Sequence, residues 1–275
     1  MKQKSISMIE KTIVRDALIS VANKYHNPKY YRNIIDRSRV KLISKLLYLL
    51  QNQGKQFEAL SILDVGCGNC DLLLFFMNLG VKKLAGVNLF PLSSDLFHSE
   101  EAIAELFGKE SGRINYIECD VDKYPLPFHD ETFDIVLLID VLEHLYDPGF
   151  ALKEIARVIK RGGYICLRTP NCANLKNRLR LLLGKSLYHE LKGWIFDHRF
   201  HVPKTGEKKF QGHIREYTVE ELNRLLGYFG FRLSHIRTHP AEHYPQHRNL
   251  LKIYNILERL YPRFAYTISI IAIRT

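Results

Sequence analysis

The residues with the clearest chemical signature follow a short apolar run. Residues 62–65 read Ile-Leu-Asp-Val, and Gly66-Cys67-Gly68 comes directly after them. An apolar run of this kind is typical of a buried parallel strand, and glycines just past its end allow a tight turn into the next helix. The N-terminus of that helix then lies close to a ligand at the carboxyl edge of the sheet. This spacing predicts a pocket for a nucleotide-like cofactor.

The residue that would complete a dinucleotide fingerprint is an acid. A Gly-x-Gly-x-x-Gly motif would have its third glycine at position 71, where this chain has Asp71. A carboxylate at a helix N-terminus repels a pyrophosphate, because both groups are anions. The loop therefore disfavours NAD, FAD and ATP, and it favours a cofactor with positive charge.

Polar side chains end three later apolar runs. Asn88 ends the first of them, about twenty residues after the loop, where folds of this kind contact ribose hydroxyls. Asp120 and Asp140 follow the next two. Because the carboxyl ends of parallel strands meet at one edge of a sheet, we expect these side chains beside the glycine loop.

Helix and strand patterns alternate through this part of the chain. Residues 164–169 are a further apolar run, and the basic segment 157–163, which ends in Gly162-Gly163, is expected to close the helix before it with a glycine stop. Alternation of this kind predicts a doubly wound, mostly parallel α/β sheet.

In the order of these segments the chain resembles the class I S-adenosylmethionine-dependent methyltransferases. The matching segments lie between residues 60 and 172 and read LDVGCGNCD, ECD, LPFHDETFD, DVLEHLYDP, RVIKRGG and LRTPN. A later stretch, GHIREYTVEEL at 212–222, is similar to the type 11-like branch that methylates small metabolites, sugars and lipid-linked acceptors. The resemblance implies a Rossmann-like sheet of seven strands, S-adenosylmethionine as the cofactor, and methyl transfer as the activity.

The resemblance also implies which residues bind the cofactor. They belong to the glycine loop and the strand ends: Asp64, Gly66, Cys67, Gly68, Asn88, Leu89, Asp120, Val121 and Asp140. Two positions depart from the family pattern, since Cys70 replaces a glycine and Asn88 replaces an acid. An asparagine accepts a ribose hydrogen bond through its carbonyl oxygen but lacks the charge-assisted, bidentate geometry of a carboxylate, so weaker cofactor binding is expected.

Two histidines are candidates for acid–base chemistry. Methyl transfer from a sulfonium requires chiefly an acceptor held in line with the methyl group and shielded from water. A hydroxyl acceptor also benefits from a general base, and His144, just after the fourth strand, is the first candidate because histidine titrates near neutrality. His213 is the second candidate. Each also has a purely structural interpretation, as a helix cap or a packing residue.

A metal site is an alternative at the same place. Asp140, Glu143 and His144 are spaced i, i+3, i+4 and could share one ion if this segment were helical throughout. The arrangement is similar to the acid-x-x-Glu-His segment that serves a divalent metal in ubiquinone-pathway O-methyltransferases. Because Asp140 belongs to a strand end, we predict no metal. Cys67 and Cys70 are likewise interpreted as small residues in a cramped turn rather than as ligands.

The charge of the chain indicates an anionic partner. Its 40 Lys and Arg against 29 Asp and Glu give a formal net charge of +11, with the excess in residues 1–55 and 161–215. Lys176 and Lys185 bracket a basic stretch just after the fifth strand, at the edge where ligands bind open sheets. We predict a small or lipid- or glycan-linked, hydroxylated and anionic acceptor that is bound by Arg178, Arg180, Arg215 and Tyr217.

Two other functions stay open. A nucleic-acid methyltransferase would suit the charge, but Thr169-Pro170-Asn171 is not the Asn/Asp-Pro-Pro-aromatic motif of base N-methylation, and no RNA-binding module is recognisable. A protein that binds S-adenosylmethionine without catalysis is the other. The sequence does not indicate an oligomeric state.

Composition and length favour one large α/β domain in the cytoplasm. The chain has 275 residues, 46% of them hydrophobic, and five irregularly spaced cysteines that argue for reduced thiols. Glu10 and Arg15 interrupt any signal-peptide core, and no apolar run is long enough to span a bilayer, so at most peripheral membrane contact is expected.

Four segments are expected. Residues 1–55 form a helical cap over the pocket, 56–172 the cofactor-binding core, 173–216 a basic insertion on the substrate side with a helix at 193–201, and 217–275 the strands that complete the sheet. Thr218 and Glu221 predict a capping box for a helix that runs to residue 228. The last strands are expected at 231–237 and 264–274.

Overall fold

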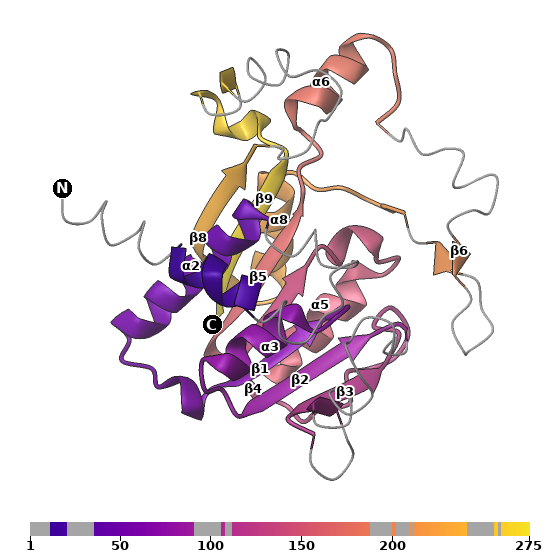
Figure 1. The fold of residues 1–275 in the computed structure, drawn as a ribbon. Helices are drawn as coiled ribbons and strands as arrows, with labels where there is room; N and C mark the ends of the chain where they lie inside the picture. Colours follow the sequence, from indigo (N-terminus) through magenta and orange to yellow (C-terminus); the bar gives the residue numbers. More distant parts are fainter. Residues whose placement is uncertain are drawn as a thin grey trace.

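The protein folds around one twisted sheet of seven strands. Figure 1 labels these strands, from β3 at one edge of the sheet to β8 at the other. The computed structural model describes residues 12–20, 36–90, 106–107, 112–187, 200–201, 209–210, 212–240, 256–257 and 260–275. The strand order is β3-β2-β1-β4-β5-β9-β8. The strands are β1 (Ser61–Val65), β2 (Lys83–Asn88), β3 (Ile114–Glu118), β4 (Phe133–Ile139), β5 (Ile159–Pro170), β8 (Phe231–His239) and β9 (Thr267–Arg274).

Strands β1 to β5 pair in parallel, whereas β9 runs antiparallel to both β5 and β8. The doubly wound, mostly parallel, seven-stranded sheet predicted from the sequence is therefore confirmed. A separate two-stranded ladder joins β6 (Phe200–His201) to β7 (Lys209–Phe210). The prediction of a helix over residues 193–201 is wrong for residues 200–201, which form β6. Residues 193–199 fall outside the described residues.

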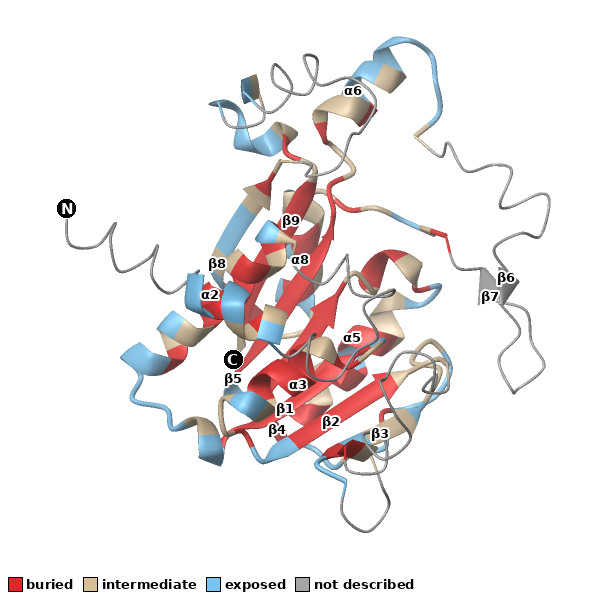
Figure 2. Ribbon diagram, viewed as in Figure 1, coloured by how far each residue is buried: buried red, intermediate tan, exposed pale blue. Residues whose placement is uncertain are grey.

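Helices cover both faces of the sheet because strand side chains alternate between them. Ile62 on β1 belongs to a core shared with α2 (Arg37–Asn52) and α3 (Asp71–Asn78). Its neighbour Leu63 points to the other core, which is shared with α5 (Pro148–Val158) and α8 (Val219–Tyr228). Figure 2 shows the central strands as almost entirely buried. None of the helices within the described residues is long and apolar enough to cross a bilayer.

The glycine pair after α5 does not stop a helix, contrary to expectation. Helix α5 ends at Val158, and β5 begins at the next residue. Phe133 pairs with Ile159 and Ile135 with Tyr164, so the chain between the two pairs leaves the ladder as a bulge. Gly162 has φ +75° there. The glycines therefore allow a bulge in a long central strand, which a helix-stop pattern resembles locally.

The helices at the two ends of the chain attach to this sheet. Residues 12–20 are helical, and their Val14 and Leu18 join the core beside α2. The capping box is confirmed, since Thr218 Oγ1 accepts from Glu221 N at 3.2 Å and Glu221 Oε2 accepts from Thr218 N at 2.8 Å. Strand β9 begins at Thr267, later than expected, because the 3-10 turn η5 (Pro262–Phe264) precedes it.

Candidate functional site

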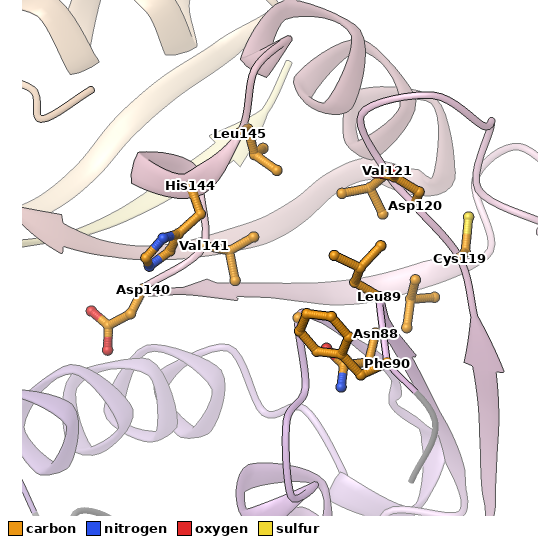
Figure 3. A pocket seen from close by; sticks show the side chains of 12 residues that line it. Asn88, Leu89, Phe90, Cys119, Asp120, Val121, Asp140, Val141, His144 and Leu145 are labelled. Atoms are coloured by element: carbon orange, nitrogen blue, oxygen red, sulfur yellow. The ribbon is translucent and has the colours of Figure 1, made fainter. Parts of the chain in front are cut away.

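A cavity opens where the strand order reverses. Strand β1 lies between β2 and β4, so the chain leaves β1 in one direction and returns to β4 on its other side. Ligands of open α/β sheets bind outside the carboxyl ends of the strands at such a point. The cavity of about 340 Å³ is lined by residues at or just after the carboxyl ends of four strands: Gly66, Val87, Asn88, Leu89, Phe90, Cys119, Asp120, Val121, Asp140, Val141, His144 and Leu145 (Figure 3).

Gly66, the residue of the glycine loop that lines this cavity, must be a glycine for steric reasons. Gly66 has φ +74°, and a Cβ at this position would lie 2.3 Å from Val141 Cγ2. The Gly66 amide donates to Val87 O at 2.7 Å, which fixes the loop to β2. Cys70, which replaces the family's glycine, has φ +60° and so keeps the left-handed conformation at some cost in strain.

The two loop cysteines pack as buried thiols. Their sulfur atoms are 3.6 Å apart, with Cys70 Sγ donating to Cys67 Sγ. This hydrogen bond and burial raise the pKa of the Cys70 thiol. Cys70 therefore stays protonated in this turn, as expected of a residue that is there for its small size.

Asn88 ends β2 and pairs with Glu118 of the neighbouring strand β3. Nearby, the phenol of Tyr116 on β3 donates to Phe90 O at 2.6 Å. Burial raises the pKa of Tyr116, so the hydroxyl remains a donor. Asn88 lines the cavity at the carboxyl end of β2, on the wall opposite His144 in Figure 3.

Asp140 turns its carboxylate away from the cavity. Figure 3 shows the carboxylate directed away from Leu89 and Phe90. Arg39 Nη2 on α2 lies 2.7 Å from Asp140 Oδ2, and Arg168 Nη1 on β5 pairs with the same oxygen. Asp140 thus lines the cavity, and its ion pairs with Arg39 and Arg168 link the end of β4 to α2 and β5.

Arg168 extends this network to the start of α2. Its Nη2 pairs with Asp36, the N-cap of the helix, and its Nε donates to Ser38 Oγ at 2.7 Å. Asp36 also accepts from Ser38 N at 2.6 Å. The side chain of Arg168 is only 10% exposed, so this network is shielded from solvent and holds the N-terminal helix against the carboxyl edge of the sheet.

A second polar group lies beside the cavity, on the loop after β4. His144 Nδ1 is 3.0 Å from Gly212 O, and His213 Nδ1 is 3.0 Å from Glu216 Oε1. The two imidazole rings meet edge to face, with their centroids 5.0 Å apart. Sequence reasoning proposed both histidines, and the fold brings them together although 69 positions separate them (213 − 144).

Glu143 completes this group. Its carboxylate is buried and accepts from Thr169 Oγ1 at 3.0 Å, and its backbone oxygen accepts from Ile214 N at 2.7 Å. Burial, together with the nearby charge of Asp140, raises the pKa of Glu143 to about 7. A carboxyl group that titrates near neutrality therefore lies next to both histidines.

The structure does not form the metal site that the spacing of Asp140, Glu143 and His144 suggested, but it brings a different set of possible ligands together. The segment after Asp140 is a 3-10 turn, η4 (Leu142–His144), so the helical face needed for i, i+3, i+4 ligation does not form. The arginines also occupy the Asp140 carboxylate. Instead, ligand atoms of Glu143, His144 and His213 lie within 4.8 Å of one another.

Three residues predicted to bind the cofactor do not line the cavity. Gly68 is exposed, whereas Asp64 and Cys67 are buried beneath the loop. Burial raises the pKa of Asp64 to about 8. The other predicted members line it, and sequence reasoning missed five further lining residues: Val87, Phe90, Cys119, Val141 and Leu145. Their adjacency to predicted residues is the only signal that could have found them.

The four predicted acceptor-binding residues lie outside the cavity walls. The Arg178 guanidinium lies 5.1 Å from the ring centroid of Phe264, and Arg180 donates to Ser186 O. Arg215 pairs with Glu221 at 2.8 Å. Tyr217 is buried, and its hydroxyl has no hydrogen-bond partner among the described residues.

Comparison with known proteins supports the resemblance. Residues 63–167 match a family described as a methyltransferase domain. The chain is 31% identical to an uncharacterized methyltransferase of Schizosaccharomyces pombe, over 50% of this chain and 56% of that protein. It is 29% identical to the ubiquinone biosynthesis O-methyltransferase of Yersinia pestis, over 51% of this chain and 54% of that protein. The chain thus spans about half the length of these curated relatives.

The fold has a solved counterpart. A S-adenosylmethionine-dependent methyltransferase from Methanosarcina mazei aligns with a TM-score of 0.52 and 22% identity, over 82% of this chain and 96% of that one. The family match covers the strands that carry the glycine loop, Asn88, Asp120 and His144. Residues 63–167 of this chain thus match a methyltransferase domain, and the chain shares the fold of an S-adenosylmethionine-dependent methyltransferase.

Proposed function

We propose that this protein binds S-adenosylmethionine in the cavity at the β1–β4 switch point and methylates a hydroxyl group of a small or lipid- or glycan-linked, anionic acceptor. The observation that carries the proposal is the position of His144, on the cavity wall next to His213 and Glu143. The ubiquinone biosynthesis O-methyltransferase among the relatives supports a hydroxyl acceptor.

The residues present suit this cofactor. Gly66 lets the backbone approach the cofactor closely, and Asn88 offers an amide oxygen for a ribose hydroxyl. Asp120 and Val121 line the neighbouring wall of the cavity. Asp71 in the first turn of α3 disfavours a pyrophosphate and suits a sulfonium. Once bound, the sulfonium supplies an electrophilic methyl group, and the protein must orient the acceptor and exclude water.

His144 would act as the general base. A carbonyl oxygen only accepts hydrogen bonds, so the contact with Gly212 O places the imidazole proton on Nδ1. In the neutral ring, Nε2 then carries the lone pair that can take a proton from the acceptor hydroxyl. The adjacent Glu143 carboxyl, whose pKa is raised to about 7 by burial, would stabilise the imidazolium when ionised.

The acceptor's negative charge is proposed from the basic residues after β5. Because Arg178 and Arg180 lie outside the cavity walls, they would act through the field that attracts the acceptor to this edge. Arg215 lies closest in sequence to the two-histidine group among the predicted acceptor residues, only two positions after His213.

The first experiment is titration calorimetry with S-adenosylmethionine, S-adenosylhomocysteine and NAD. We expect binding of the first two, and preferential NAD binding would overturn the proposal. A screen of cell extract with radiolabelled methyl donor, followed by fractionation, then identifies the acceptor. Labelled RNA or DNA as the product would support nucleic-acid methylation instead, and cofactor binding without any product would support a non-catalytic role.

The role of His144 as general base is tested with the acceptor that the screen of cell extract identifies. His144→Ala should lower kcat by about 10²–10⁴-fold while S-adenosylhomocysteine affinity stays the same. His129→Ala, at an exposed histidine outside the cavity, is the matched control. Loss of activity in EDTA, restored by a divalent cation, would reassign Glu143, His144 and His213 to a metal site.

A further inference from the structure

Helix α6 (Leu175–Leu182) exposes leucines rather than burying them. Leu179 is 48% exposed, Leu181 57%, Leu182 82%, and Leu183, just past the helix, 71%. The buried residue of this helix is Asn177. An amphipathic helix of a globular protein normally turns its apolar side to the core. Four exposed leucines so close in sequence are typical of an interaction site.

The same segment is uniformly basic. Residues 171–187 contain Lys176, Arg178, Arg180 and Lys185 and no acidic residue. Exposed leucines interleaved with cations are typical of helices that lie in the plane of a membrane interface, where the apolar side chains enter the acyl boundary and the cations meet anionic headgroups.

The segment is fixed to the rest of the protein. Asn171 is buried, and its Nδ2 donates to Arg263 O at 3.1 Å and to Ala265 O at 2.8 Å. The Arg178 guanidinium lies over the ring of Phe264. These contacts place η5 beside α6, as Figures 1 and 2 also show.

The neighbouring segment adds to the exposed apolar surface. Leu260 is 67% exposed and Tyr261 56%. Tyr261 stacks at an angle on Phe264, with ring centroids 5.4 Å apart. The contact of Arg178 with Phe264 joins these two segments, which are distant in sequence. We name the residues at the end of α6 the leucine–arginine face: Arg178, Leu179, Arg180, Leu181, Leu182 and Leu183. Leu260 and Tyr261 are exposed on the segment that contacts α6.

We propose that the leucine–arginine face docks the protein onto a lipid bilayer that contains anionic headgroups. The arginines would pair with headgroup phosphates while Leu182 and Leu183 enter the acyl boundary. Helix α6 follows the carboxyl end of β5, at the sheet edge where the cavity opens. Docking would therefore bring that edge to the membrane surface. Docking itself does not depend on methyl transfer.

Two other partners fit less well. A nucleic acid would use the arginines, but it offers nothing for leucines to enter, since sequence-tolerant binding relies on aromatic stacking. A second copy of the chain would cover the leucines only by bringing two sets of cations together, and like charges repel.

The test is cosedimentation of the purified chain, without cofactor, with vesicles of phosphatidylcholine alone or mixed with phosphatidylglycerol. We expect binding only to the anionic vesicles. Leu182→Ser with Leu183→Ser should weaken binding about tenfold, because two apolar side chains no longer enter the interface. Tyr228→Ser, at an 84% exposed residue on α8, is the matched control and should change nothing.

A second pair of variants isolates the charge. Arg178→Gln with Arg180→Gln should weaken binding about thirtyfold, since each cation near an anionic surface contributes about fivefold. Lys82→Gln with Lys83→Gln removes two exposed charges at the start of β2, the opposite edge of the sheet, and should have little effect. Thermal unfolding and S-adenosylhomocysteine binding of every variant establish that it is folded.

Three results would overturn the proposal. The first is the absence of binding to anionic vesicles. The second is vesicle binding that the leucine variant leaves intact, because a general attraction of charges would then explain it. The third is a dimer that dissociates in the leucine variant together with absent vesicle binding, which would assign the face to a second copy of the chain.

Discussion

Gly66→Ala should destabilise the protein through two separable costs. The backbone at this position has φ +74°, which costs an L-residue about 1–2 kcal/mol. The new Cβ would also lie 2.3 Å from Val141 Cγ2, whereas carbon atoms pack at about 3.5–4 Å. Relief of such overpacking typically costs about 1–3 kcal/mol. The expected loss in free energy of unfolding is therefore about 2–5 kcal/mol.

The second cost depends on Val141 and can be removed. In Val141→Ala the clashing Cγ2 is gone, and the nearest remaining atom, Cβ, lies 3.4 Å from the new methyl group. The double variant should thus be about 1–3 kcal/mol more stable than the sum of the single effects, as expected for residues in contact. Gly68→Ala is the matched control, since it has φ +50° with no atom within 4 Å of the added carbon. It should show the backbone cost alone and no coupling to Val141.

Urea denaturation of the wild type, the three single variants and the two double variants with Val141→Ala measures these energies. Calorimetry with S-adenosylhomocysteine shows whether the cavity survives. Additivity of Gly66→Ala with Val141→Ala would refute the reasoning, because the clash would then not contribute. Equal costs at positions 66 and 68 would refute it as well.

Three further predictions follow from the same contacts. Arg168→Gln should lower the free energy of unfolding by about 3 kcal/mol, because it removes the ion pairs with Asp36 and Asp140 and leaves Asp140 with Arg39 alone. Thermal unfolding against Arg161→Gln, whose side chain is 72% exposed, measures the difference. Burial and neighbouring cations lower the pKa of His239 to about 3, so the folded state stays neutral while the unfolded state is protonated below about pH 6.5. Stability is then lost as the pH falls, and wild type should lose about 2 kcal/mol more than His239→Leu between pH 7 and pH 5; a pH-independent difference contradicts this. Asn88→Asp should tighten S-adenosylmethionine binding by about 1 kcal/mol in calorimetry through a charge-assisted ribose contact, and the gain should persist in Tyr116→Phe; lower affinity would mean that the pocket is built around the amide.

The local patterns of the sequence were sufficient for the frame of the fold. Apolar runs predicted β1, β2, β3, β4 and β5 within a few residues, except at the start of β5. The residues predicted at the ends of these runs, with the resemblance, supplied half of the cavity wall: Gly66, Asn88, Leu89, Asp120, Val121 and Asp140. These features are local, because strand burial, tight turns and capping depend on residues only a few positions apart. The capping box of α8 is an example, since it involves only Thr218 and Glu221.

Tertiary structure decided which way the side chains face and with which residues they pair. Asp140 has the spacing of a ligand-binding acid, yet its carboxylate is held by Arg39, 101 positions away, and by Arg168. His213 reaches His144 only because the chain returns to Glu143 after the segment that follows β5. The glycine pair that indicates a helix stop becomes a bulge because β5 must pair with β4 on one side and β9 on the other. Such contacts depend on how distant segments of the chain pack against each other. The spacing of residues along the sequence does not determine that packing.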